Sequence, residues 1–350
     1  ESIIASKTKQ FDIVKRELLE VKKAQNSPRM TVIVDGDTQM NYSAPSEAEA
    51  VQYRDGILTV NSDGMMRFMS QKTFVTARKD IEGMTTDALP MQYASVNNKG
   101  TLYVVTDMGN LARLDVTDLP EKRFKEKPFK LLNVNQDAAT NESVVKVLFF
   151  EGAPAGELML FTRGGIVKRV DLSEFNSVSK AYFKAINLVD GDSVISAEVV
   201  DESGSIMEIT RLGQVLRYEL AEVPVQGRTA GGVKGVKLND GDSVVYAGQN
   251  DDEGEVIVIT DNGHAKRVIL ATIDITSRYN KGVKIVELDK ASVKYAGLVK
   301  MPYDLAVSEG GSTHLINTED IRIDGRTTKG KQIYKNTRID VVAAFASDGN

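Results

Sequence analysis

An apolar run ends in a glycine turn and a basic pair in the stretch VIVITDNGHAKR, residues 256–267. The same pattern occurs five more times, as ILTVNSDGMMR (57–67), YVVTDMGNLAR (103–113), MLFTRGGIVKR (159–169), MEITRLGQVLR (207–217) and LAVSEGGSTH (305–314). The turn glycines recur every 45 to 56 residues, at Gly64, Gly109, Gly165, Gly213, Gly263 and Gly311. A repeat of this length is typical of a propeller blade built from four strands.

A second set of glycines supports this register. Nine residues before a turn glycine stand Gly100, Gly156, Gly204 and Gly254. The two glycines bracket one short strand, and glycine suits both places because hairpin turns need positive φ. Each blade alone has an apolar face that it cannot bury, so the blades must pack side by side. The sequence therefore predicts an all-β, six-bladed β-pinwheel or propeller-like disc, either closed or spiral.

The first residues follow a different period. Phe11, Val14, Leu18 and Val21 are spaced by three and four residues among charged ones, which predicts an amphipathic helix that ends before Pro28. We assign residues 1–27 to this helix and residues 28–350 to the disc. Two interpretations stay open: a helix packed on the disc, or the end of a coiled-coil arm from a preceding domain. Because Glu1 falls in mid-helix, we expect the chain to be part of a longer protein.

Composition excludes several classes of site. The 350 residues include no Cys, which removes disulfides and thiolate chemistry and fits a reducing cytoplasm. Only His264 and His314 exist, so a histidine-based triad or metal site has little support. No apolar run approaches the roughly 18 residues that span a bilayer. The net charge of −5 argues against a generally basic nucleic-acid binder.

The positive charge is nevertheless concentrated in one phase of the repeat. Cations stand fifteen residues after the turn glycine at Lys180, Arg228, Arg278 and Arg326, and glycines stand nineteen after it at Gly83, Gly232, Gly282 and Gly330. The windows 78–85, 122–130, 179–186, 226–237, 277–286 and 325–335 hold 19 of the 44 basic residues but only 3 of the 49 acidic ones. Equivalent positions on successive blades would form a ring of cations on one edge.

A curved basic edge on an acidic body suits duplex DNA, whose phosphates would bend around it. The windows contain nothing typical of base readout, so we expect little sequence preference. Glycines beside the cations would let the backbone approach phosphate. The candidate phosphate contacts are Arg78, Lys79, Arg123, Lys127, Lys180, Lys184, Arg228, Lys234, Arg278, Lys281, Arg326 and Lys329. A second group of candidates follows the turn glycines directly: Lys168, Arg169, Lys266 and Arg267.

Other functions compete with DNA binding. Basic loops that merely solvate an ordinary propeller are the plainest alternative. A protein- or carbohydrate-binding propeller would use the central opening or the top-face loops, and a propeller enzyme would need a clustered acid–base or metal set. Residues 325–331 superficially match a phosphate-binding loop, but Gln332 replaces the required Ser or Thr. The turns at 190–192 and 240–242 offer too few oxygens for Ca²⁺, so hairpin turns are favoured.

The six turns followed by basic loops resemble the C-terminal β-pinwheel domain of type IIA DNA topoisomerase A subunits, those of gyrase and topoisomerase IV. The opening FDIVKRELLEVKKAQNSPRMTVI (11–33) resembles the end of the coiled coil that precedes that domain. The resemblance implies binding of double-stranded DNA within an ATP-hydrolysing isomerase, and an A2B2 assembly with an ATPase partner. It implies no catalytic residue and no cofactor here, since the family's nucleophile, ATP and Mg²⁺ belong to other domains.

Gyrase carries a Q-R-R-G-G-K-G box after its first blade. The equivalent residues 77–83 read ARKDIEG, in which two cations and the last glycine remain and two replacements are acidic. Residues 226–232, QGRTAGG, hold another trace of the box. Loss of the box resembles topoisomerase IV, which relaxes and decatenates DNA, and the alternative is a gyrase wrapping domain with a degenerate box.

Overall fold

The computed structural model describes residues 6–24, 54–61, 64–115, 119–130, 142–334 and 338–345. The chain divides into two compact units, residues 1–52 and residues 53–350. In the first unit, α1 spans Lys7–Ala24, and none of its residues is buried. The predicted amphipathic helix is confirmed over this stretch. The predicted boundary between residues 27 and 28 lies outside the described residues and stays a prediction.

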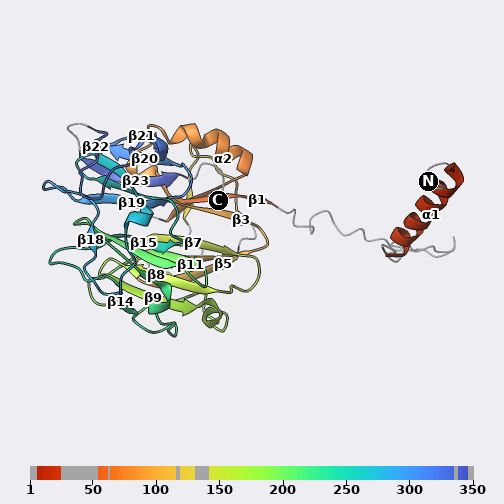
Figure 1. Ribbon diagram of the computed structural model, residues 1–350, viewed down its shortest axis with the longest axis horizontal. Helices are drawn as coiled ribbons and strands as arrows, with labels where there is room; N and C mark the ends of the chain where they lie inside the picture. The colour runs from red at the N-terminus through yellow and green to blue at the C-terminus, as the bar shows by residue number, and fades with distance from the viewer. Residues whose placement is uncertain are drawn as a thin grey trace. The chain divides into compact units, whose positions relative to one another are not determined.

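The second unit consists of six antiparallel sheets, which we number as blades 1 to 6 (Figure 1). Blade 1 contains β1 (Asp55–Asn61), β2 (Met65–Met69), β3 (Pro90–Asn97) and β6 (Phe129–Lys130). Blade 2 contains β4 (Thr101–Thr106), β5 (Asn110–Asp115), β7 (Val144–Phe150) and β10 (Tyr182–Lys184). Blade 3 contains β8 (Glu157–Thr162), β9 (Ile166–Asp171), β11 (Val194–Val200) and β14 (Val233–Lys234). The predicted six-bladed, all-β disc is therefore confirmed.

The remaining blades follow the same plan. Blade 4 contains β12 (Ser205–Thr210), β13 (Gln214–Glu219), β15 (Val244–Asn250) and β18 (Val283–Lys284). Blade 5 contains β16 (Glu255–Thr260), β17 (His264–Ile269), β19 (Val293–Val299) and β22 (Lys331–Gln332). In blade 6 the described strands are β20 (Asp304–Glu309), β21 (Ser312–Asn317) and β23 (Ile339–Phe345).

Short helices lie between some of the strands. The first repeat has α2 (Gln71–Ala77), η1 (Arg78–Ile81) and η2 (Thr86–Ala88). In the later repeats a 3-10 turn follows the outer hairpin strand, as η4 (Leu172–Phe175), η5 (Leu220–Glu222), η6 (Leu270–Thr272) and η7 (Thr318–Asp320). Among the described helices, none has the length and apolar character needed to span a bilayer.

The predicted hairpin turns are present in every blade. All six turn glycines have left-handed backbone, with φ between 74° and 84°, which costs residues with a Cβ about 1 kcal/mol. Three glycines of the second set also have positive φ, but Gly100 does not. A Cβ on Gly100 would lie 2.2 Å from the Phe149 ring, so lack of space excludes a side chain there. The positive-φ explanation is wrong for that position.

The fourth strand of each complete blade comes from the next repeat. β14 follows β13 in sequence but pairs with β9 of the preceding blade, with Val233 opposite Val167. β18 and β22 do the same with β13 and β17. A Cβ on Gly282 would lie 2.2 Å from the Val215 carbonyl oxygen, and Gly232 and Gly330 meet the preceding blade in the same way. Strand exchange by itself therefore requires glycine at these three positions; their predicted approach to phosphate stays a prediction.

The ring is closed. The innermost strands β3, β7, β11, β15, β19 and β23 contact one another in turn, and β23 returns to β3. In place of an exchanged strand on blade 6, Gly83 N–H donates to the Thr313 carbonyl (3.0 Å), and Thr313 Oγ1 donates to the Met84 carbonyl (2.6 Å). The first repeat therefore completes the last blade. The sequence left open whether the disc is closed or spiral, and these contacts show a closed disc.

Each blade packs on both neighbours. In β12, Ile206 joins a cluster with Met159 and Phe161 of blade 3, whereas Met207 joins Val256 of blade 5 in the next cluster. Side chains alternate across a strand, so one apolar run serves two cores. Six such clusters lie between neighbouring blades. One apolar face was expected for each blade from the sequence; the central strands bury both.

Candidate nucleic-acid interface

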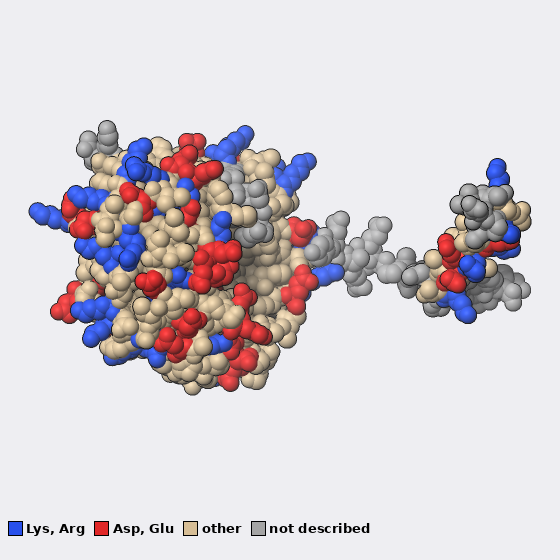
Figure 2. Space-filling model, in the orientation of Figure 1, with Lys and Arg blue, Asp and Glu red and all other residues tan. Residues whose placement is uncertain are grey.

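The cationic windows lie at the outer edge of the disc, in the segments that lead into the exchanged strands. We call residues 122–130, 179–186, 226–237, 277–286 and 325–334 the rim. Each rim segment follows the hairpin of its own blade in sequence, and its strand pairs with the preceding blade. Figure 1 places β14, β18 and β22 along one edge, at the left, with β15 and β19 further in. Figure 2 shows Lys and Arg gathered along that edge, whereas Asp and Glu are more frequent toward the opposite side of this face.

Most predicted contacts are exposed lysines. These are Lys79, Lys127, Lys180, Lys184, Lys234, Lys281 and Lys329, and Arg123 is exposed as well. The Lys234 ammonium lies 4.9 Å from the centre of the Tyr279 ring and donates to its hydroxyl (3.2 Å). Lys329 pairs with Asp289, both partly exposed. Exposed ion pairs contribute about 0–1 kcal/mol, so a phosphate can compete for these lysines.

Two of the rim arginines link neighbouring rim segments. Arg228 is half-buried: its Nη1 donates to the Lys184 carbonyl (3.4 Å), and its guanidinium carbon lies 5.9 Å from the centre of the Phe183 ring. Arg278 repeats this bridge, with Nη1 donating to the Lys234 carbonyl and Nε to the Glu222 carbonyl. Each side chain thus links one rim segment to the preceding one. Arg326 is half-buried too.

In the second group of predicted contacts, the two lysines are wrong because their side chains are buried. Lys168 and Lys266 have no exposed surface, and their ammonium groups donate to backbone carbonyls of the rim. The side chains of Arg169 and Arg267 are 14% and 13% exposed and pair with Glu157 and Glu255. The two lysines therefore cannot meet a phosphate, whereas the two arginines are largely enclosed and held in ion pairs.

The sequence held a signal that Lys168 and Lys266 are buried. They stand three residues after the turn glycine, where two other blades have Ala112 and Leu216. Apolar residues in that phase indicate an inward-facing position, because equivalent positions of a repeat share one environment. A cation at such a position is unusual, because charged residues are rarely buried.

The first repeat departs from the regular rim. Arg78 begins η1, and its side chain lies outside the described ones; Lys79 beside it is exposed. Asp80, one of the acidic replacements in the box-like stretch, pairs with Lys125 at 3.0 Å. A carboxylate here partly neutralises one rim cation, Lys125.

Blade 4 contains a buried carboxyl group close to the rim. Glu208 on β12 has no exposed surface, and burial raises its pKa to about 8. The Tyr218 hydroxyl donates to its Oε1 at 2.8 Å. A Cβ on Gly235 would collide with the same carboxyl group, so glycine follows exchanged strand β14 at this point. Glu208 was not predicted from the sequence, because its neighbours on β12 give an ordinary apolar pattern.

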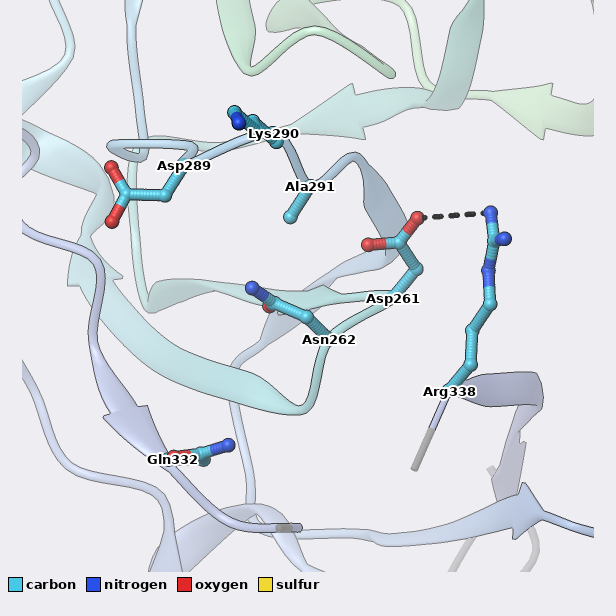
Figure 3. A pocket seen from close by; sticks show the side chains of 7 residues that line it. All are labelled: Asp261, Asn262, Asp289, Lys290, Ala291, Gln332 and Arg338. Carbon is cyan, nitrogen blue, oxygen red and sulfur yellow. Dashed lines mark hydrogen bonds and ion pairs between the residues drawn. The ribbon is translucent and has the colours of Figure 1, made fainter. Parts of the chain in front are cut away.

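An open pocket of about 470 Å³ lies beside the hairpin turn of blade 5 (Figure 3). It is lined by Asp261, Asn262, Asp289, Lys290, Ala291, Gln332 and Arg338. The Asp261 carboxylate already accepts from Ser292 N–H (3.1 Å), Ser292 Oγ (2.9 Å) and Arg338 Nη2 (3.4 Å). These three hydrogen bonds hold the Asp261 carboxylate in the turn.

The two turns that superficially suggest calcium loops have the same structure. Asp192 Oδ1 accepts from Gly164 N–H (2.7 Å), and Asp242 Oδ1 accepts from Leu212 N–H (2.9 Å). These carboxylates join the turns of one repeat, as the hairpin interpretation predicts. Within the part of the chain that the structure describes, no group of three or more His, Asp or Glu is arranged to hold a metal ion.

Part of the disc is similar to a known family. The family described as "DNA gyrase C-terminal domain, beta-propeller" matches residues 156–201, 205–250 and 254–299. The DNA gyrase A subunit of Chlamydia muridarum is 31% identical over 234 residues, which cover 64% of this chain and 27% of that protein. The DNA gyrase A subunit of Halalkalibacterium halodurans is 26% identical, covering 67% of this chain and 28% of that protein. The chain thus spans about a quarter of the length of these relatives.

Two solved structures share the fold. One is titled "Crystal structure of the C-terminal domain of DNA topoisomerase IV", with a TM-score of 0.72 and 23% identity, covering 85% of this chain and 95% of that one. The other is titled "Structure of DNA gyrase A C-terminal domain", with a TM-score of 0.65 and 18% identity, covering 83% and 100%. At these identities, the likeness shows the fold alone.

Proposed function

From the premise that this chain carries a C-terminal β-propeller of the kind found in gyrase and topoisomerase IV, we propose that it binds duplex DNA along the rim and bends it. One observation carries the proposal: strand exchange sets lysines of successive repeats, among them Lys184, Lys234 and Lys281, exposed on the same edge. The contacts are to phosphates, so binding depends little on base sequence. Arg123, Lys127, Lys180 and Lys329 extend the same track.

In the longer protein, the domain guides DNA segments for ATP-dependent strand passage by a type IIA topoisomerase that relaxes and decatenates DNA. That protein is an isomerase in the bacterial cytoplasm, associated with the chromosome and not with a membrane. Two copies of it assemble with two copies of an ATPase partner as A2B2, and ATP and Mg²⁺ act in other domains. The chain itself contributes binding and bending and no catalytic residue. The acidic replacement Asp80, paired with Lys125, supports the topoisomerase IV assignment.

A gyrase wrapping domain with a degenerate box is the second candidate, favoured by the names of the sequence relatives. Relaxing a closed plasmid with a nicking–closing enzyme in the presence of the chain separates the two. A gyrase-type wrap of fixed hand shifts the linking number with each bound domain. Bending of the topoisomerase IV type leaves the linking number near that of the free plasmid.

The proposal predicts a steep salt dependence of DNA binding. A mixed-sequence duplex of about 40 base pairs, with a fluorophore at each end, is titrated with the chain from 50 to 200 mM salt. With six or more phosphate contacts, the affinity falls about 1,000-fold over this range, because each contact releases a condensed counterion. Energy transfer between the ends rises on binding as the duplex bends. Binding indifferent to salt, or none at 50 mM, contradicts the proposal and favours a protein-binding propeller.

A further inference from the structure

Two buried cations lie directly behind the rim, in blades 3 and 5. We propose that the ammonium groups of Lys168 and Lys266 are positioning residues for DNA binding, which fix the carbonyl groups of the rim segments and so hold the neighbouring exposed cations toward the duplex. This inference rests on the proposed function, because it assigns the two side chains a task within that DNA-binding edge. Neither residue touches phosphate.

Lys266 has the more complete set of contacts. Its Nζ donates to the carbonyl oxygens of Gly325 (2.7 Å), Arg326 (2.9 Å) and Thr328 (2.8 Å). An ammonium has three donors, and all three are used within one short turn of the rim. The turn carries Arg326 and Lys329, two predicted phosphate contacts. Removing the ammonium would leave these three carbonyls without their shared donor.

Lys168 joins two rim segments. Its Nζ donates to the Ala185 carbonyl (2.7 Å), directly after Lys184, and to the Arg228 carbonyl (2.5 Å) of the next segment. In blade 1 the same repeat position holds Arg67, whose Nε donates to the Glu126 carbonyl (3.3 Å). Three blades thus place a cation in one phase behind the rim, and each reaches a rim carbonyl. Recurrence at one phase indicates a common task.

The charge of these lysines is balanced only weakly. Arg228 and Glu174 are the charged groups that act on Lys168, and Asp324 is the one that acts on Lys266. Burial lowers the pKa of both ammonium groups to about 8. Between about pH 8 and the unfolded pKa of 10.5, these two lysines bind more protons in the unfolded chain than in the folded one. Their contribution to the free energy of unfolding therefore rises with pH over this range. A nearby duplex favours the charged form of these lysines. DNA affinity should therefore fall as pH rises, because the lysines lose their charge.

The test uses the whole chain and the 40-base-pair duplex. Lys168→Met and Lys266→Met, together, should weaken binding about tenfold at pH 7, since the rim cations lose their fixed orientation. The parent should lose about fivefold in affinity from pH 7 to pH 9.5, and the double variant should lose much less. Glu208 also titrates in this range, but it is present in both proteins and cancels in the comparison.

Val258→Ala is the matched control. Val258 lies opposite Lys266 in the β16–β17 pair and is buried, so the substitution destabilises the same blade but keeps the rim contacts. It should bind DNA as the parent does at a temperature where both are folded. A folded double variant with parental affinity and the parental pH profile overturns the proposal. If the parent binds no DNA, while rim amides exchange faster in the double variant, the positioning contacts stand and the DNA-binding function fails.

Discussion

Changing Lys184, Lys234 and Lys281 to glutamine is expected to weaken duplex binding about 100-fold at 0.1 M salt, and to lower the slope of log affinity against log salt by about one for each lysine. All three side chains are exposed on successive rim segments. Glutamine keeps a polar side chain but removes the charge, so the change acts on phosphate attraction. Fluorescence anisotropy at several salt concentrations measures both quantities.

The control removes the same charge elsewhere on the disc. Lys99, Lys294 and Lys300 are also at the surface, but they lie on or next to the inner strands β3 and β19. Their glutamine variant should bind within about twofold of the parent, since exposed charges beyond a Debye length are screened. Equal losses in the two triple variants would mean that net charge alone, and not the rim, attracts DNA.

Lysines serve this test better than the arginines at the repeat-phased position. Arg228 and Arg278 donate to the carbonyls of Lys184 and Lys234, so reversing their charge also breaks links between rim segments. A loss of affinity in such variants would combine structural and electrostatic effects. The lysine side chains are exposed, and the contact of Lys234 with the Tyr279 hydroxyl is itself at the surface.

Gly282→Ala is expected to destabilise the disc by about 2–4 kcal/mol, from left-handed backbone and overpacking together. Gly282 has φ +74°, and its Cβ would lie 2.2 Å from the Val215 carbonyl oxygen. The exchanged strand β18 would have to move away from β13, and the ladder that joins blades 4 and 5 would weaken. Urea unfolding followed by far-ultraviolet circular dichroism measures the change.

Gly241→Ala separates the two causes. Gly241 has φ +69°, but nothing lies within 4 Å of its Cβ position, so only the cost of left-handed backbone remains, about 1 kcal/mol. If both substitutions lower the free energy of unfolding by the same amount, the close contact at the exchanged strand contributes nothing to the loss of stability. The glycine would then be needed for its turn alone.

The plan of the disc could be predicted from sequence because its turns carry their own chemistry. Turns that need positive φ can be recognised in the sequence by their glycines, such as Gly165, Gly213 and Gly263. The apolar run before each glycine identifies the central strand. Strand exchange could not be predicted, since β14, β18 and β22 are each two residues long. Two residues show no periodicity, and their pairing depends on a partner about 66 residues away, as Val233 with Val167.

The sequence predicted that the cationic windows share one edge of the disc, but not which of their side chains are exposed. Clustering of cations in one repeat phase located the rim, because equivalent residues of a repeat lie at equivalent places. Whether a given cation faces solvent depends on local packing: Lys184 is exposed, while Lys168 is enclosed by the turn that it holds. Closure through Thr313 also escaped prediction, since its partner Met84 lies in a first repeat of irregular sequence.

The central claim is that DNA lies on the rim, and lysine footprinting tests it most directly. The chain is treated with an amine-reactive reagent with and without bound duplex, and each lysine is quantified by mass spectrometry. We predict protection of Lys180, Lys184, Lys234 and Lys281, with unchanged labelling of Lys99, Lys294 and Lys300. Protection of the second set, with the rim lysines still labelled, would place DNA on another face and contradict the account.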